Sequence, residues 1–175
     1  IGLRDSTALW FFQVAAGGQI RWIDYYEAHG EQLKHYVDII QAKEYSYADD
    51  LILPHDAGHE RLGAESIDYQ LRGLGFGARV LPVERSVLPG IEACRVAIGQ
   101  SVFDRERTQQ GRACLNAYQR EYDDKRQVFK PTPLHNWASD GADSFRYAVR
   151  AINKGYTSNI GWSQPDYSQL NRAAI

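Results

Sequence analysis

The stretch from Asp140 to Ile152 constrains the fold most, because it has the periodicity of a helix that must bury one face. Four apolar residues recur at spacings of three and four, as on the buried side of a helix: Phe145, Ala148, Val149 and Ile152. A different face carries a carboxylate, two guanidinium groups and a phenol, from Asp143, Arg146, Tyr147 and Arg150. The segment therefore predicts a core helix with a carboxylate among cations near its start.

Two acidic residues near this helix start, Asp140 and Asp143, allow two interpretations. A carboxylate in this position is well placed to bind a divalent metal that an upstream strand also ligates. Alternatively, Asp140 caps the helix and Asp143 is its partner three residues on, as in a capping box. The spacing leaves both interpretations open, and the two are compatible.

The rest of the chain predicts strands and helices in alternation. Strands are predicted at residues 7–14, 19–27, 51–54 and 78–83. Helices are predicted at residues 31–42, 64–74, 86–102 and 107–122, followed by a loop or exposed hairpin at 123–134. The first two strands are joined by a short turn with two glycines, so they should pair antiparallel. This order describes an α/β fold, with a mixed sheet flanked by helices.

Length and composition fit one globular domain with its own hydrophobic core. The 175 residues are 43% hydrophobic, and no run of 18 apolar residues predicts a membrane span. We expect one domain at residues 1–154 and an irregular tail at 155–175. The sequence contains no methionine and opens directly toward a strand, so we expect it to be a fragment of a longer chain.

Charge is distributed unevenly along the chain. The net charge of −2 argues against a protein that coats nucleic acid by bulk attraction. Residues 125–154, however, contain six Lys or Arg and two Asp, a local charge of +4 that leaves −6 for the remainder. The candidate phosphate contacts in this segment are Lys130, Arg146 and Arg150. For each of them a solvated cation on a helix face is an equally good interpretation.

Cysteine and histidine give little support to a metal site built from soft ligands. Cys94 and Cys114 lie on apolar faces of predicted helices without CxxC spacing, which predicts buried free thiols. Zinc is the alternative use for His55, His59 and His135. The first two are four residues apart, but the intervening Asp-Ala-Gly opposes a helix. A turn-stabilising or substrate-contacting role is therefore favoured.

Asp56 is the candidate carboxylate upstream of the helix. It follows a short buried strand, and sites in α/β sheets form at the carboxyl ends of strands and at adjoining helix starts. A turn residue is the alternative, and it is stronger still for Asp5. Carboxylates that converge from distant positions are what a Mg²⁺ site requires, and two such ions can promote phosphodiester hydrolysis.

Four motifs occur in an order that resembles a known family. They are Gly2-x-x-Asp5-Ser6-Thr7-Ala8, Ile23-Asp24-Tyr25-Tyr26-Glu27, Leu53-Pro54-His55-Asp56-Ala57 and Ser139-Asp140-Gly141-Ala142-Asp143-Ser144-Phe145-Arg146-Tyr147-Ala148. Together they resemble the C-terminal nuclease domain of the large terminase subunit of tailed bacteriophages, which cuts and packages viral DNA. The resemblance covers roughly residues 1–151.

The resemblance implies a ribonuclease H-like fold and a two-metal site of three acidic residues that binds Mg²⁺ or Mn²⁺. The second acid corresponds to Asp56 and the third to Asp143, with Asp140 as a helper. The first belongs to an Asp-x-Gly pattern whose glycine matches Gly2, so it would fall just before Ile1. The direct metal role of Asp5 is doubtful in the family.

The resemblance also implies partners. They are double-stranded DNA, an ATPase domain upstream in the same polypeptide, the small terminase subunit and the portal, in the cytoplasm of an infected host cell. The expected activity is endonucleolytic cutting of concatemeric viral DNA. Two alternatives remain open, a resolvase- or transposase-like nuclease of the same fold and a non-catalytic module that grips DNA or docks on a portal.

Overall fold

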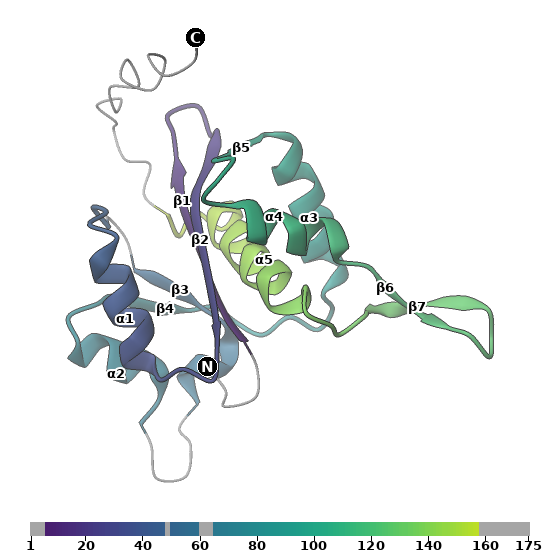
Figure 1. The fold of residues 1–175 in the computed structure, drawn as a ribbon, viewed down its shortest axis with the longest axis horizontal. Helices are drawn as coiled ribbons and strands as arrows, with labels where there is room; N and C mark the ends of the chain where they lie inside the picture. Colours follow the sequence, from purple (N-terminus) through teal and green to yellow (C-terminus); the bar gives the residue numbers. More distant parts are fainter. Residues whose placement is uncertain (1–5, 48–49, 60–64, 158–175) are drawn as a thin grey trace.

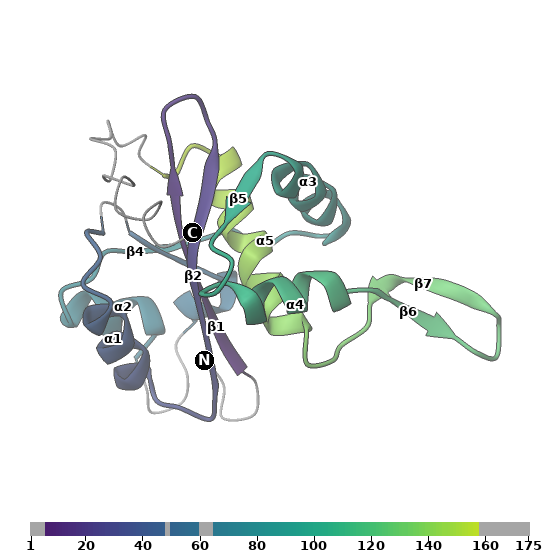
Figure 2. The same ribbon diagram turned by 45° about the horizontal axis from the view of Figure 1, so that its top comes forward.

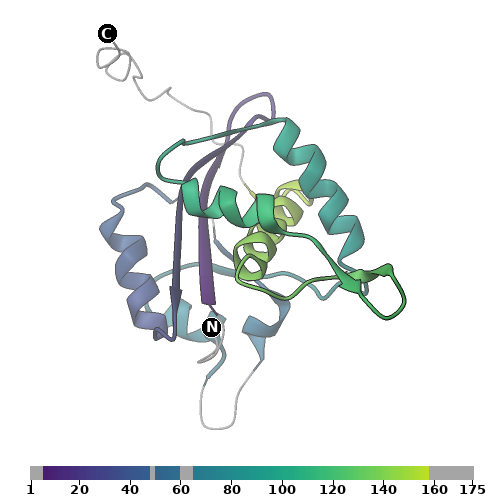
Figure 3. The same cartoon turned by 45° about the vertical axis from the view of Figure 1, so that its right-hand side comes forward.

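The computed structural model describes residues 6–47, 50–59 and 65–157. Its strands are β1 (Ser6–Val14), β2 (Ile20–His29), β3 (Leu51–Leu53), β4 (Ala78–Val80), β5 (Ser101–Phe103), β6 (Arg120–Asp123) and β7 (Val128–Pro133). Its helices are α1 (Leu33–Ala42), α2 (Ile67–Gly73), α3 (Leu88–Gly99), α4 (Gln109–Ala117) and α5 (Ser139–Asn153), with a short 3-10 helix η1 (His55–Gly58). In Figures 1 and 3, α3, α4 and α5 lie on one side of the β1–β2 hairpin, and α1 and α2 lie on the other.

The strands pair as a mixed α/β arrangement. β1 and β2 pair antiparallel from Ser6 opposite His29 to Val14 opposite Ile20. Gly17 and Gly18 form their turn with φ angles of 89° and 83°, a conformation that glycine adopts without strain. β5 pairs parallel with β2, and β3 pairs parallel with β4. The predicted α/β class with a mixed sheet is therefore confirmed, and hydrogen bonding divides the described strands into a three-stranded sheet and two two-stranded sheets, the last of them β6–β7.

Helix α5 packs against β1 and α3 and supplies much of the core. Phe145 and Val149 are fully buried and Ala148 nearly so, which confirms the predicted apolar stripe, while Ile152 packs at its edge. The aromatic part of this core surrounds Trp22, whose ring centroid lies 4.2 Å from that of Phe145. A second, smaller cluster lies around α1, α2 and the β3–β4 pair, and contains Val37, Leu71 and Ala78.

Helices α4 and α5 approach closely because Gly141 has no side chain. A Cβ at Gly141 would lie 2.6 Å from the Tyr25 hydroxyl oxygen and 2.8 Å from the Cys114 sulfur. The Gly141 carbonyl also accepts a hydrogen bond of 2.9 Å from the indole of Trp10. The start of α5 is thus held against both β1 and α4. Both cysteines are free as predicted; Cys114 is buried and Cys94 is partly buried.

Two predicted helices are too long. The helix predicted at 86–102 ends at Gly99 and is followed by β5, and the helix predicted at 107–122 ends at Ala117 and is followed by β6. An apolar face of Leu88, Ile91, Cys94 and Ile98 is expected from the spacing of the former; Cys94 packs against the core, but Leu88 and Ile98 are exposed while Gly90 and Ala97 are buried. The segment predicted as a loop or hairpin is the hairpin β6–β7, which projects away from the body (Figures 1 and 2).

Some predictions concern residues outside the described part of the chain. Asp5 and Gly2 lie there, as does the predicted irregular tail beyond residue 157. Among the described residues, no helix is both long and apolar enough to cross a membrane.

Candidate active site

The two principal candidate carboxylates come from different elements that meet at one tyrosine. Asp56 lies in η1, directly after β3, and is exposed. Asp143 lies on α5, one turn before Tyr147. Burial raises the pKa of the Tyr147 phenol; Arg146 and Arg150 oppose this, whereas Asp56 and Asp143 both add to it. Asp56 and Asp143 are 87 positions apart in the sequence, and the contact between their two elements is made by their neighbours His55 and Tyr147.

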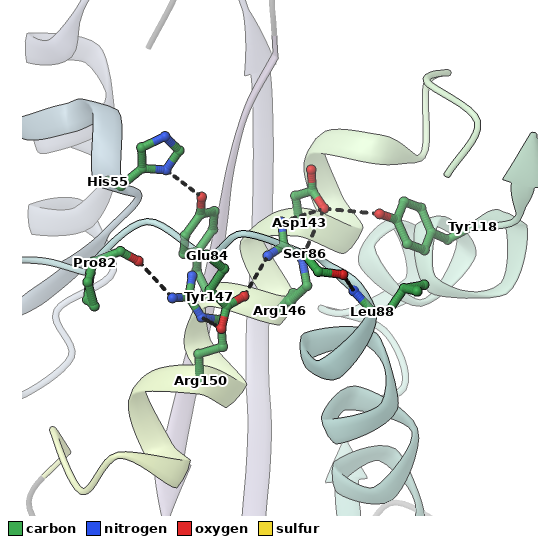
Figure 4. A network of polar contacts seen from close by, with 10 residues as sticks. All are labelled: His55, Pro82, Glu84, Ser86, Leu88, Tyr118, Asp143, Arg146, Tyr147 and Arg150. Carbon is green, nitrogen blue, oxygen red and sulfur yellow. Dashed lines mark hydrogen bonds and ion pairs between the residues drawn. The ribbon is translucent and has the colours of Figure 1, made fainter. Parts of the chain in front are cut away.

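A hydrogen bond connects the two elements directly. His55 Nδ1 lies 3.2 Å from the Tyr147 hydroxyl oxygen, so η1 and α5 are joined at this point (Figure 4). The ring of Tyr147 is in turn covered by two guanidinium groups, with Arg146 and Arg150 at 5.1 Å and 5.2 Å from its centroid. His55 thus contacts a residue of the site. The ring centroid of His59 lies 6.3 Å from that of His55.

Asp143 is held through one of its two carboxylate oxygens. Oδ1 accepts hydrogen bonds from the Tyr118 hydroxyl at 3.1 Å and from Arg146 Nε and Nη2 at 3.3 Å and 3.1 Å. The side chain is 43% exposed. In Figure 4 the second oxygen points away from both partners, and no described residue donates a hydrogen bond to it. Asp143 therefore presents Oδ2 to the outside.

Asp140 is not a helix cap. The residue that precedes α5 is Ala138, and no side chain of the described residues caps the helix there, so the capping-box interpretation is wrong. Instead, Asp140 Oδ2 accepts a hydrogen bond of 3.2 Å from the backbone N–H of Ser6 at the start of β1. The turn before α5 is stabilised by Asn136, whose side chain accepts from the Ala138 N–H, and by Ser139, which donates to the Leu134 carbonyl.

Arg146 and Arg150 are buried rather than displayed on a solvated helix face. Their side chains are 7% and 5% exposed. Glu84, in the segment after β4, lies between them, with 3.6 Å from Oε2 to Arg146 Nη1 and 2.8 Å from Oε1 to Arg150 Nε. Arg150 also donates to the Pro82 carbonyl at 2.8 Å. The interpretation as solvated cations is thus wrong for both arginines, because protein groups surround and pair them.

Electrostatics within this cluster favour the ion pairs. Burial alone would lower the pKa of Arg146, but the neighbouring Asp143 carboxylate and its hydrogen bonds raise it. Tyr118 is affected in the same direction: burial raises the pKa of its phenol, and Asp143 adds to the effect. Both donors to Asp143 Oδ1 therefore keep their protons at neutral pH.

Lys130 is placed differently from the two arginines. It lies on β7 of the projecting hairpin, and its side chain is 41% exposed while its amine pairs with Glu121 across the hairpin at 2.5 Å. The predicted phosphate contacts of Lys130, Arg146 and Arg150 stay predictions. The exposure of the three side chains favours Lys130 over the two arginines for that role.

The donors at this site fit a hard divalent cation in chemical type. Asp56 and Asp143 offer carboxylate oxygens, which Mg²⁺ and Mn²⁺ prefer, and Asp143 Oδ2 is open to such a contact. Within residues 6–47, 50–59 and 65–157, no group of three or more His, Cys, Asp or Glu is arranged to hold a metal. The metal-binding roles of Asp56, Asp143 and Asp140 therefore stay predictions.

Three contacts of the site could not be found from the sequence. They are the ion pair of Glu84 with Arg146, the hydrogen bond from Tyr118 to Asp143, and the bond between His55 and Tyr147. Each contact depends on which elements meet in the folded chain. Glu84 follows a short strand and has no motif around it. Only the helical spacing of Asp143 and Tyr147 gave a signal, because residues four apart share one helix face.

The fold defined by these elements is that of the ribonuclease H-like nuclease domains of phage large terminases. The predicted resemblance is therefore confirmed at the level of the fold. The large terminase of a thermophilic bacteriophage superposes with a TM-score of 0.62 at 17% sequence identity, over 87% of this chain and 37% of that one. The large-terminase nuclease domain of bacteriophage SPP1, determined with bound manganese, gives 0.56 at 18% identity, over 86% of this chain and 80% of that one.

Sequence comparisons add no further relative. No family model matches the chain, and no curated protein matches its sequence. The chain spans 37% of the length of the large terminase from the thermophilic phage, so the partners and other activities of a whole terminase are proposals for this chain.

Proposed function

We propose that this chain is the metal-dependent endonuclease domain of a viral DNA-packaging terminase. The domain, at residues 1–154, would cut concatemeric genome DNA in the host cytoplasm by two-metal phosphodiester hydrolysis. The observation that carries the proposal is the contact between His55 and Tyr147, which joins the element that carries Asp56 to the helix that carries Asp143, in a fold shared with a nuclease domain that has manganese bound. Double-stranded DNA is the substrate.

Asp56 and Asp143 would hold Mg²⁺ or Mn²⁺, and Asp140 would support the site from the first turn of α5. The metal supplies an activated water and stabilisation of the leaving oxygen. The protein's own residues would orient the metal ligands and balance the charge of the buried arginines. Tyr118 and Arg146 fix Asp143, His55 and Tyr147 hold η1 beside α5, and Glu84 offsets the charge of the buried arginines.

DNA binding would depend on exposed surface cations. Lys130 on the projecting hairpin is the best placed of the three predicted contacts, because it is the most exposed. Carboxylates that face DNA repel phosphate unless a cation lies between them, which favours a metal-binding nuclease over a module that only grips DNA. Partners proposed for the whole protein are an ATPase domain of the same polypeptide, the small terminase subunit and the portal.

The proposal is tested by nicking of supercoiled plasmid with Mn²⁺, with Mg²⁺ and with chelator. We expect cutting that requires metal and is abolished in Asp143→Asn, which keeps the size of the side chain but removes its charge. Asp38→Asn is the matched control, because Asp38 lies on α1 in an exposed ion pair with Lys34. Its activity should equal that of the unchanged protein.

Other outcomes point to specific alternatives. Cutting of four-way junctions in preference to linear duplex would favour a resolvase-like nuclease. DNA binding without cutting, unaffected by chelator, would favour a non-catalytic module. Cutting by Asp143→Asn at the normal rate would refute the assignment of the site.

A further inference from the structure

We propose that Tyr118 is a positioning residue that, together with Arg146, fixes the Asp143 carboxylate so that Oδ2 alone is presented to the metal. This inference rests on the proposed function, because it assigns how one ligand of that site is oriented. Neither residue is a catalytic residue, since both act through Asp143. Tyr118 lies at the end of α4, 25 residues before Asp143, and nothing in the sequence pattern marks it.

The hydrogen bonds to Asp143 converge on one oxygen. A hydroxyl and two guanidinium nitrogens all donate to Oδ1, at distances from 3.1 Å to 3.3 Å. An aspartate carboxyl otherwise rotates about its last bond and exchanges its two oxygens. With Oδ1 fixed from two directions, this rotation would break every one of these bonds. The direction in which Oδ2 points is therefore set before any metal binds (Figure 4).

Both donors are themselves held by packing. Tyr118 directly follows α4, and α4 packs against α5 at Gly141, where an added Cβ would lie 2.9 Å from that of Cys114. The stem of Arg146 passes Gly90 of α3, where an added Cβ would lie 2.8 Å from the Arg146 Cδ. Helices α3 and α4 thus each position one donor to the carboxylate on α5.

The charge balance of the cluster leaves Oδ2 able to bind a cation. A guanidinium that belonged to Asp143 alone would compete with a metal for the carboxylate. Arg146 is instead shared with Glu84, which also pairs with Arg150. The two arginines are matched by two carboxylates, so Asp56 remains as an additional negative charge for an incoming cation.

The inference is tested by Mn²⁺ binding, measured through the electron paramagnetic resonance of free Mn²⁺. Tyr118→Phe removes the hydroxyl and keeps the ring, and we expect it to raise the Kd for Mn²⁺ about tenfold, the lower end of the effect of losing an outer-shell partner. Tyr69→Phe is the matched control, because Tyr69 on α2 is 60% exposed. Its Kd should not change.

A double-variant comparison shows whether the effect passes through Asp143. In an Asp143→Asn background, Tyr118→Phe should change Mn²⁺ binding no further. In nicking assays, the Mn²⁺ concentration for half-maximal rate should rise about tenfold with Tyr118→Phe alone, while the rate at saturating Mn²⁺ returns to within about twofold of normal. Circular dichroism of Tyr118→Phe without metal separates this effect from a loss of folding.

The possible failures are distinguishable. If Asp143→Asn abolishes Mn²⁺ binding but Tyr118→Phe binds as the unchanged protein does, the positioning role is refuted and the proposed function stands. If Tyr118→Phe weakens binding equally in both backgrounds, its effect does not pass through Asp143 and the inference is also refuted. If the unchanged protein shows no Mn²⁺ binding that depends on Asp143, the proposed metal site fails and the inference fails with it.

Discussion

Replacing Glu84 by glutamine should destabilise the protein far more than the same change at an exposed ion pair. Glu84 is the shared partner of Arg146 and Arg150, whose side chains are 7% and 5% exposed. Glutamine has nearly the same shape but no charge. Arg146 would keep Asp143 as a partner, whereas Arg150 would retain its hydrogen bond to the Pro82 carbonyl and its contact with the Tyr147 ring but no carboxylate. A buried cation would then lack a counter-charge.

The size of the expected loss of stability follows from the burial of the two arginines. Breaking a buried ion pair by removing one partner costs about 3–5 kcal/mol, because the other charge is left uncompensated. Glu84 itself is 27% exposed, so water can partly replace it, and the lower end of about 3 kcal/mol is expected. For a chain of this length each kcal/mol lowers the Tm by about 2–4 °C, which gives a decrease of roughly 6–12 °C.

Thermal unfolding followed by circular dichroism measures this decrease. The control is Glu92→Gln on α3, because Glu92 pairs with Arg95 at 2.6 Å while the two side chains are 66% and 68% exposed. An exposed pair of this kind contributes about 0.5 kcal/mol or less, so the Tm should fall by no more than about 2 °C. If the two variants lowered the Tm equally, the account of Glu84 as the counter-charge of buried arginines would be wrong.

Three other changes test the packing, the thiols and the DNA contact. Gly141→Ala should lower the free energy of unfolding by about 1–3 kcal/mol through overpacking, despite the better helix propensity of alanine. The control is Gly99→Ala, where an added Cβ meets open space, so this change should be neutral or stabilising. Urea unfolding measures both. Burial raises the pKa of Cys94 to about 12 from about 9, so the native thiol should react with a disulfide reagent at pH 8 about a thousandfold more slowly than in denaturant. Since this pKa is raised by folding, the associated stability is present below about pH 9 and is lost as the pH rises toward 12; equal reaction rates would contradict the burial. Lys130→Ala should weaken DNA binding and reduce its salt dependence by about one counterion in a titration at several salt concentrations, whereas Lys34→Ala on α1 should leave both unchanged.

The elements that sequence reasoning predicted well are those with a repeated pattern. Helix α5 has several turns with one apolar face, and β1 and β2 are long strands joined by a glycine turn. β5 and β6 have only three and four residues, too few for a period to be visible, so the preceding helices were extended through them. Helix α3 differs from its prediction in another way: it buries two small residues, Gly90 against Arg146 and Ala97 in the core, rather than its larger apolar side chains.

In the candidate site, too, features with a local sequence signal were predicted and long-range contacts were not. The sequence indicated which elements carry Asp56 and Asp143, because a strand end and a helix start are recognisable locally. It could not show that Glu84 occupies the two arginines, since that pairing joins segments more than 60 residues apart. Asp140 illustrates the limit most clearly. Local spacing allowed a helix cap, but the Asp140 carboxylate accepts a hydrogen bond from the backbone of Ser6, 134 positions away.

The two candidate carboxylates are attached to two different hydrophobic clusters, so their relative position depends on how both clusters are folded. Asp143 belongs to the helix that completes the large aromatic cluster, whereas Asp56 follows β3, which packs in the small cluster with Val37 and Leu71. A part held by fewer buried contacts opens more readily than the rest of a protein. Transient opening of the small part would therefore separate the two carboxylates while the large core stays folded. Assembly of the site would then depend on a local equilibrium, which any ligand that bridges Asp56 and Asp143 shifts toward the closed form.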